Sequence, residues 1–193
     1  VMLKDLPNLK RYLIAFFFFN MGVQTIMLLA TLFGTKELNL GSAQLIPIIL
    51  IIQFVAIGGA FVFARLSESK GNIFSLWSMI FIWIGICIYA YFITEVYQFY
   101  IIAVLVGAVM GGIQALSRAT YSKLIPADTE DHTSFFSFFD VAYHVSVVLG
   151  TFSYGFVEHL TGSMRNSTIA LSIYFIIGFI ILIQVKVHHA KAS

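Results

Sequence analysis

The sequence is short of charge, cysteine and proline. Asp, Glu, Lys and Arg together make up 10% of its 193 residues, whereas soluble domains are about a quarter charged. A chain of this size and composition cannot hide its apolar side chains from water, so an ordinary soluble domain is excluded. The single cysteine, Cys87, excludes an intramolecular disulfide and a thiolate metal cluster. Three prolines and 16% aromatic residues exclude a disordered chain.

Long apolar runs fill most of the chain instead. Hydrophobic residues make up 60% of the sequence, and a helix that rises about 1.5 Å per residue needs roughly 20 of them to cross a bilayer core. Runs such as FFFF and IILII do not alternate as the strands of a membrane barrel do. The sequence therefore predicts an all-α integral membrane protein, in contact with the lipid bilayer, with six transmembrane helices at about 12–34, 45–64, 73–94, 97–116, 133–157 and 168–185.

Lysine and arginine are unequally divided between the two sides of these spans. With a cytoplasmic amino terminus, only Lys36 and Arg165 lie on the far side, and nine lie in the cytoplasm. Cytoplasmic loops of membrane proteins carry such an excess, so we expect both termini in the cytoplasm. The net charge of +2 is small and its basic residues are scattered, so nucleic-acid binding has no support. The nine are Lys4, Lys10, Arg11, Arg65, Lys70, Arg118, Lys123, Lys186 and Lys191.

Small residues recur every four positions in two of the spans. Lipid does not drive helices together, so close packing in a membrane depends on such smooth faces. The pattern predicts close helix packing, and the same faces would suit a sliding or rocking surface. The residues are Ala56, Ala60 and Ala64 in the second span, and Ala103, Gly107, Gly111 and Ala115 in the fourth.

Four of the amide side chains within the spans lie at membrane depth, where each is costly unless it faces a partner or water. Asn20 and Gln24 lie one helical turn apart on the first span. Gln53 lies near the middle of the second span, and Gln114 lies toward the cytoplasmic end of the fourth. Amides in membranes either join neighbouring helices by hydrogen bonds or contact a substrate. We take these four as candidate substrate-binding residues and keep both interpretations open.

Asp140 and His144 are the only ionisable residues well inside a span. They are four positions apart and share a helix face. Counted from Thr133, they lie about 10 and about 16 Å deep. Histidine side chains change charge near neutral pH, so a histidine one turn from a carboxylate suits a proton relay or a substrate anchor. Asp140 has a structural alternative, which is an ion pair with Arg118 near the interface.

Motifs for enzyme chemistry are missing. The sequence has no GxSxG, no HExxH, no phosphate loop and no paired intramembrane aspartates. His188 and His189 have no third ligand nearby, so they do not indicate a metal site. We therefore expect neither an enzyme nor a bound cofactor or metal.

Five segments in order along the chain carry a resemblance to a known family. They are RYLIAF followed by NMGVQTI (11–26), LIIQFVAIGGA (50–60), WIGICIYAYFIT (83–94), VGAVMGGIQALSRATYSKLIP (106–126) and FFSFFDVAYHVSVVLGTFSYG (135–155). The chain resembles the branch of the major facilitator superfamily that contains the vacuolar amino-acid effluxer of autophagy and its bacterial relatives. The segment GGIQALSR (111–118) is the most specific of the matches.

The resemblance implies the carboxyl-terminal six-helix half of a secondary transporter, built from two three-helix repeats. It implies a cytoplasmic linker at 1–11, the bundle at 12–187 and a cytoplasmic tail at 188–193. Such a bundle needs an amino-terminal six-helix half as its partner, and the two halves transport by alternating access around a site between them. We expect efflux of a small metabolite such as an amino acid, across the inner (plasma) membrane of a bacterium.

The sequence departs from the family pattern at three places. Met21 stands where the family has an acidic residue, and His144 stands where it commonly has lysine, which makes the local charge pH-dependent. The superfamily's cytoplasmic loop motif survives only in part, and its basic half is gone. We take Glu68, Gly71 and Arg118 as candidate residues of conformational loops.

Two other classes of function fit six helices of this length. One is the substrate-capturing subunit of an energy-coupling-factor vitamin importer, which would retain its vitamin through purification. The other is an assembly protein without a transported substrate, which would tolerate substitution of Asp140 or His144.

Overall fold

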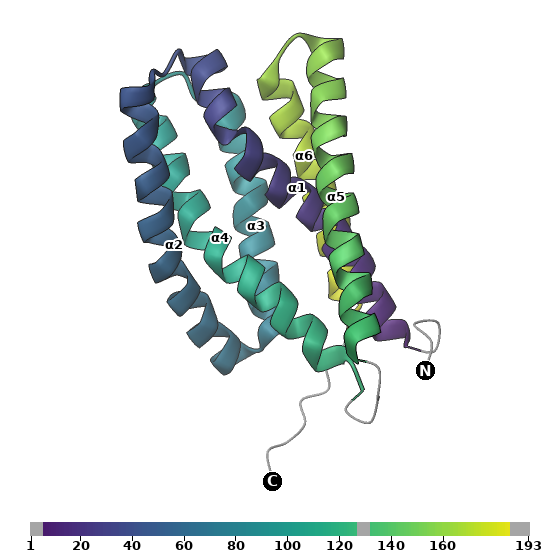
Figure 1. The fold of residues 1–193 in the computed structure, drawn as a ribbon. Helices are drawn as coiled ribbons and strands as arrows, with labels where there is room; N and C mark the ends of the chain where they lie inside the picture. Colours follow the sequence, from purple (N-terminus) through teal and green to yellow (C-terminus); the bar gives the residue numbers. More distant parts are fainter. Residues whose placement is uncertain (1–5, 127–131, 186–193) are drawn as a thin grey trace.

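The computed structural model describes residues 6–126 and 132–185, most of which lie in six helices (Figure 1). Each helix holds an apolar window long enough to cross a membrane, which confirms the predicted all-α bundle of six spans. The described residues contain no strand. The helices are α1 (Pro7–Leu38), α2 (Ser42–Lys70), α3 (Asn72–Phe92), α4 (Val96–Leu124), α5 (His132–Thr161) and α6 (Met164–Ile183).

Successive helices run in opposite directions, so the bundle has two ends (Figure 1). At the end named here the terminal face, α1 begins, α2 meets α3, and α4 and α6 end. The other end, the opposite face, holds the α1–α2, α3–α4 and α5–α6 connections. Of the eight described lysines and arginines, only Lys36 and Arg165 lie toward the opposite face. Lys4, Lys186 and Lys191 lie outside the described residues, and the cytoplasmic position of the terminal face stays a prediction.

The helices run beyond the apolar stretches that defined the spans. α2 continues to Lys70 and α4 continues to Leu124, which corrects the expected connectors at 65–72 and 117–132. Both extensions consist largely of polar and charged residues; that of α2 is mostly exposed, whereas Ser117, Thr120 and Tyr121 in that of α4 are buried in the bundle. Only Gly71 separates α2 from α3, and its φ of 89° lies in the region that favours glycine.

The packed pairs of helices repeat between α1–α3 and α4–α6. α2 packs on α4, and the equivalent α5 packs on α1. α3 packs on α4 as α6 packs on α1, and α2 packs on α3 as α5 packs on α6. The other two pairs are α1 with α4 and α3 with α6, and each of them joins a helix to its equivalent in the other repeat. Every well-packed pair therefore has a counterpart, which supports two three-helix repeats.

The two faces of small residues lie against each other where α2 crosses α4. A Cβ atom added to Gly59 would lie 2.6 Å from the carbonyl carbon of Ala108 and 2.8 Å from its Cα. A Cβ added to Gly111 would lie 2.6 Å from the carbonyl oxygen of Ala56, and Gly107 approaches the backbone of α2 in the same way. The prediction of close packing through these faces is confirmed, since only glycine leaves room for such backbone contacts.

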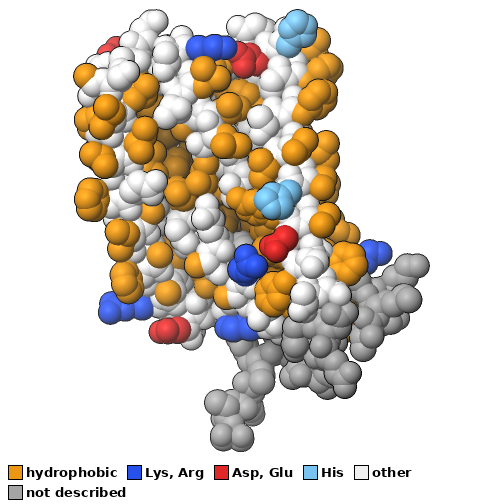
Figure 2. Space-filling model, viewed as in Figure 1, with side chains coloured by type: hydrophobic (Ala, Val, Ile, Leu, Met, Phe, Trp, Pro, Cys, Tyr) orange, Lys and Arg blue, Asp and Glu red, His pale blue; other side chains and the backbone are white. Residues whose placement is uncertain are grey.

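The sides of the bundle are apolar, and two of the helices are less buried than the others. Figure 2 shows hydrophobic side chains over the flanks, with charged side chains at and near the two ends. Only 11% of the apolar window of α2 and 22% of that of α5 is buried, against 33–50% for the other four helices. The core lies between the remaining helices, where the rings of Trp83 and Phe175 stack 5.7 Å apart. α2 and α5, which are equivalent in the repeats, are therefore the outward helices.

A group of polar contacts, named here the Arg165 clasp, holds the opposite face together. The Nε of Arg165 donates to Glu37 at 2.9 Å, and its Nη1 donates to the carbonyl oxygens of Tyr91 and Ile93. The second carboxylate oxygen of Glu37 accepts the Met164 N–H at 3.1 Å. The clasp thus ties the start of α6 to the end of α1 and caps carbonyls at the end of α3.

The terminal face has a corresponding joint, named here the Asn72 joint. The amide of Asn72 donates to the Thr120 hydroxyl at 3.1 Å, and the Lys123 ammonium donates to the amide oxygen of Asn72 at 3.1 Å. The start of α3 is thereby tied to the end of α4, which is the counterpart of the α6–α1 connection.

Candidate functional site

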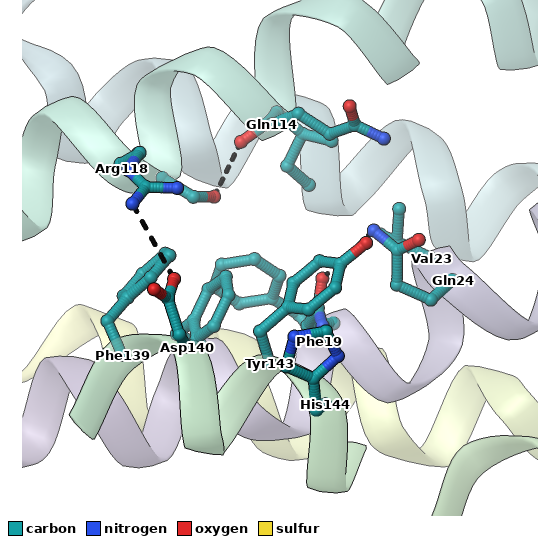
Figure 3. A pocket seen from close by; sticks show the side chains of 13 residues that line it. Phe19, Val23, Gln24, Gln114, Arg118, Phe139, Asp140, Tyr143 and His144 are labelled. Atoms are coloured by element: carbon teal, nitrogen blue, oxygen red, sulfur yellow. Dashed lines mark hydrogen bonds and ion pairs between the residues drawn. The ribbon is translucent and has the colours of Figure 1, made fainter. Parts of the chain in front are cut away.

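A pocket of about 390 Å³ opens between α1, α4 and α5 (Figure 3). Its volume falls in the range of sites for small molecules, about 300–1,000 Å³. α4 and α5 are not a well-packed pair, and the pocket occupies the gap between them. Its lining residues are Phe16, Phe19, Asn20, Val23 and Gln24 of α1, Ile113, Gln114, Ser117 and Arg118 of α4, and Phe139, Asp140, Tyr143 and His144 of α5.

Asn20 and Gln24 form the wall of the pocket on α1, and both are nearly buried. The Asn20 amide donates to the Ser146 hydroxyl at 2.6 Å, and Gln24 donates to the Asn20 oxygen at 3.3 Å. The Ser146 hydroxyl in turn donates to the carbonyl oxygen of Tyr143 at 2.7 Å. This chain joins α1 to α5, so Asn20 has the helix-joining role and also lies at the pocket surface.

Arg118 and Asp140 face each other across the gap between α4 and α5 (Figure 3). Arg118 Nη2 lies 3.6 Å from Asp140 Oδ1, and both side chains are more than half exposed. The guanidinium also lies over the rings of Phe136 and Phe139, at 5.5 and 5.8 Å from their centres. The structural alternative for Asp140, an ion pair with Arg118, is therefore present, and it lies inside the pocket.

His144 lines the pocket one helical turn beyond Asp140, as their spacing predicts. Its ring meets the Tyr143 ring edge to face at 5.2 Å. Within the described part of the chain, His144 makes no ion pair with Asp140, whose charged partner is Arg118. The imidazole and the carboxylate therefore share one wall of the pocket without direct contact.

The structure separates the two remaining glutamines. Gln114 lines the pocket from α4, and its amide lies 3.5 Å from the sulfur of Met27 on α1. Gln53 lies exposed on α2 and does not line the pocket.

The three candidate loop residues also lie apart. Glu68 is on the last turn of α2 and Gly71 is the joint to α3, both at the terminal face. Arg118 lies within α4, six residues before that helix ends at Leu124, so it faces the pocket and is not in a loop.

Several lining or supporting residues were missed in the sequence, among them Phe139, Tyr143 and Ser146. Tyr143 and Phe139 each precede a predicted residue by one position, and helical spacing puts them on the adjacent face. Ser146 gives no signal in the sequence, because a serine within a span usually bonds to its own helix. In residues 6–126 and 132–185, no three His, Cys, Asp or Glu side chains lie close enough to hold a metal ion. His188 and His189 lie outside those ranges.

Comparison with known proteins gives matches over the full length of the chain. Residues 1–193 match the family model described as vacuole effluxer Atg22 like. The Bacillus subtilis protein named uncharacterized MFS-type transporter YxiO is 34% identical over 89% of the chain. Autophagy-related protein 22 of Eremothecium gossypii is 27% identical over 97% of the chain, and that of Saccharomyces cerevisiae is 27% identical over 84%.

The chain spans only part of these relatives: 39% of the Bacillus protein, 39% of the Eremothecium protein and 32% of the Saccharomyces protein. The matches follow the whole chain and are not confined to one motif. The names of the family and of these relatives describe effluxers, transporters and autophagy proteins and no enzyme, in agreement with the missing catalytic motifs.

Proposed function

The chain belongs to the Atg22-like vacuole effluxer family of major-facilitator-type proteins, and from this membership we propose that it is the carboxyl-terminal half of a secondary transporter. Its cargo is a small metabolite, with amino acids as the leading class, and it works by alternating access with an amino-terminal six-helix half. In a bacterium the transporter lies in the inner membrane, with the terminal face of this bundle in the cytoplasm.

The observation that carries the proposal is the pocket between α1, α4 and α5. It gathers six of the predicted polar site residues into one space within the bundle. Each such group is costly in lipid unless it meets a partner, water or a ligand. Gln24 and Gln114 supply amide donors and acceptors from opposite sides, and the aromatic rings supply apolar contact. A small molecule with both polar and apolar parts fits this lining.

The proposed partner half covers the outward helices. α2 and α5 are equivalent in the repeats and leave most of their apolar windows unburied. Lipid covers apolar side chains equally well, but it does not satisfy the exposed groups of Gln114, Arg118 and His144 that line the pocket beside α5. A second bundle would enclose the pocket and leave the other sides to lipid. In this proposal 1–11 is the linker from the partner half, 12–187 is the bundle and 188–193 is a cytoplasmic tail.

We assign different roles to the residues of the pocket. Asn20, Gln24, Gln114 and His144 contact the substrate, and His144 with Asp140 forms the route for a coupling proton. Gln53 is outside this set, because it does not line the pocket.

Transport by reconstituted protein tests the proposal. The longer transporter that carries this chain is placed in liposomes with radiolabelled amino acids, and exchange across the membrane is measured. Gln24→Leu and Gln114→Leu should each reduce exchange about tenfold or more, since a hydrogen bond to a charged group is worth about 1.5–3 kcal/mol. Gln53→Leu is the matched control and should retain exchange. Equal loss in all three variants would show that the pocket is not the transport site.

Family membership favours this function over the two alternatives. A vitamin-capturing subunit would retain a vitamin through purification, and mass spectrometry of the purified protein detects one. An assembly protein would show no exchange of any labelled metabolite in the same liposomes.

A further inference from the structure

Arg118 carries a fixed positive charge in the pocket that the fold leaves largely unused. Its side chain is 59% exposed, and it donates no hydrogen bond to any residue that the structure describes. Its contacts are the ion pair with Asp140 and the faces of Phe136 and Phe139. The rings hold the plane of the guanidinium in place and use none of its five N–H groups.

The ion pair with Asp140 is too long to occupy those donors. A charge-assisted hydrogen bond between nitrogen and oxygen is about 2.8 Å long, whereas Nη2 and Oδ1 are 3.6 Å apart. Exposed pairs of this kind contribute little to stability. The adjoining ends of α4 and α5 have another connection, because the Tyr121 hydroxyl donates to the Phe135 carbonyl oxygen at 2.7 Å. Holding the two helices together therefore does not require the pair.

The pocket contains one side chain of each fixed charge. Arg118 is its only lysine or arginine, and Asp140 is its only carboxylate, among the described residues that line it. The rest of the lining consists of amides, the hydroxyls of Ser117 and Tyr143, an imidazole, and aromatic and aliphatic groups. An anionic group that enters this space has one strong partner, and that partner already has a loosely held counter-ion.

We propose that Arg118 is the anchor for a carboxylate of the ligand, and that Asp140 is the resident counter-ion which this carboxylate displaces. The planar fork of a guanidinium matches two carboxylate oxygens, and Figure 3 shows the Arg118 side chain directed into the gap toward α5. The inference rests on the proposed function and deepens it, because it names the chemical group by which the transporter selects its cargo.

Displacement makes a distinctive prediction for Asp140. If the ligand must compete with Asp140 for Arg118, then removing the Asp140 charge favours the ligand. Asp140→Asn should tighten binding of a carboxylate ligand about two- to fivefold, the equivalent of one exposed ion pair. A residue needed only for structure, or one that directly contacts the ligand, would change affinity in the other direction. Arg118→Gln should weaken binding about ten- to hundredfold.

Equilibrium binding to the purified longer transporter tests the assignment. The standard L-amino acids are screened by isothermal titration calorimetry in nanodiscs of phosphatidylcholine, and the tightest is compared with its carboxamide. Wild-type protein should prefer the acid, Arg118→Gln should bind the acid and the amide equally, and Arg118→Lys should keep part of the preference. Lys36→Gln removes a cation of the opposite face that pairs with Glu158, and it is the matched control with an unchanged preference.

Several outcomes would overturn the inference. A preference for the acid that persists in Arg118→Gln, or weaker binding by Asp140→Asn, removes Arg118 as the anchor while the proposed function survives. Competition by phosphatidylglycerol added to the nanodiscs would assign Arg118 to a lipid phosphate instead of the cargo. Wild-type protein that binds no amino acid would reject the proposed cargo class together with the inference. Should Arg118→Gln fail to fold, the direction of the Asp140→Asn effect still decides.

Discussion

Two adjacent glycines on α2 give a sharp test of the fold. Gly59 is buried against α4, whereas Gly58 is exposed and a Cβ atom added there meets nothing within 4 Å. Alanine is a better helix former than glycine by about 1 kcal/mol. Gly58→Ala should therefore leave the free energy of unfolding unchanged or raise it by up to about 1 kcal/mol.

Gly59→Ala should have the opposite effect. The new methyl group would collide with the carbonyl oxygen, the carbonyl carbon and the Cα of Ala108, and a backbone cannot rotate away as a side chain can. Overpacking of this kind costs about 1–3 kcal/mol or more. The two variants should thus differ by about 1–4 kcal/mol, which corresponds to roughly 2–16 °C in Tm for a chain of this length.

The assay is thermal unfolding of the detergent-purified protein, followed by the loss of monodisperse material on size-exclusion chromatography. A second pair repeats the test at the equivalent α5–α1 contact. A Cβ atom on Gly150 would lie 2.6 Å from the carbonyl oxygen of Met21, whereas one on Gly155 meets nothing. If Gly59→Ala melts at the same temperature as Gly58→Ala, the close approach of α2 and α4 is refuted.

Three further predictions concern the membrane, the clasp and the pocket. In a Cys87→Ala background, Lys36→Cys should react with an impermeant thiol reagent added outside intact cells, and Glu68→Cys should not. Labelling of Glu68→Cys but not of Lys36→Cys would show that the bundle has the opposite orientation. Arg165→Gln should lower the free energy of unfolding by about 2–4 kcal/mol, because it leaves the largely buried Glu37 carboxylate without its charged partner. Chemical denaturation measures this loss, and Lys36→Gln, which removes an exposed cation, is the control. In the full transporter, His144→Ala should flatten the pH dependence of transport while expression is unchanged, and a wild-type pH profile would show that the imidazole only packs.

The sequence predicted the spans and the small-residue faces because the membrane imposes both. Hydrocarbon thickness sets the length of an apolar helix, and only small residues permit contact between backbones. The ends of the helices were harder to place. Charged residues such as Arg118 look like the start of a loop once the apolar run stops, although a helix continues into water wherever its residues favour it.

The candidate site was predicted in part. Sequence spacing tells which residues share a helix face, but it does not tell how each helix is rotated about its axis and so which face meets the pocket. Spacing alone predicts that Asp140 and His144 share a helix face, and it predicts the same for Asn20 and Gln24 on α1. Gln53 shows where this reasoning ends. The small residues of α2 predict which side of this helix packs closely, but they do not indicate which helix that side meets or whether Gln53 reaches the pocket. Which helices meet around the pocket is a property of the tertiary packing, and the role of Ser146 as the partner of Asn20 follows only from that packing.

The fixed charges of the pocket lie on one side of it. The helix α1 contributes the neutral amides of Asn20 and Gln24 to the pocket, and its equivalent α4 contributes Gln114 and Arg118. The next equivalent pair breaks the symmetry, because α5 brings Asp140 and its neighbours into the pocket while α2 contributes no lining residue. Fixed charges therefore gather at the α4–α5 side and neutral amides on the α1 side. A ligand with one charged end and one apolar end has a single favourable orientation in such a pocket, with its charged end toward α4 and α5. The gap between α4 and α5 leaves the pocket open on that side, and this is the side that the partner half encloses in the proposed transporter.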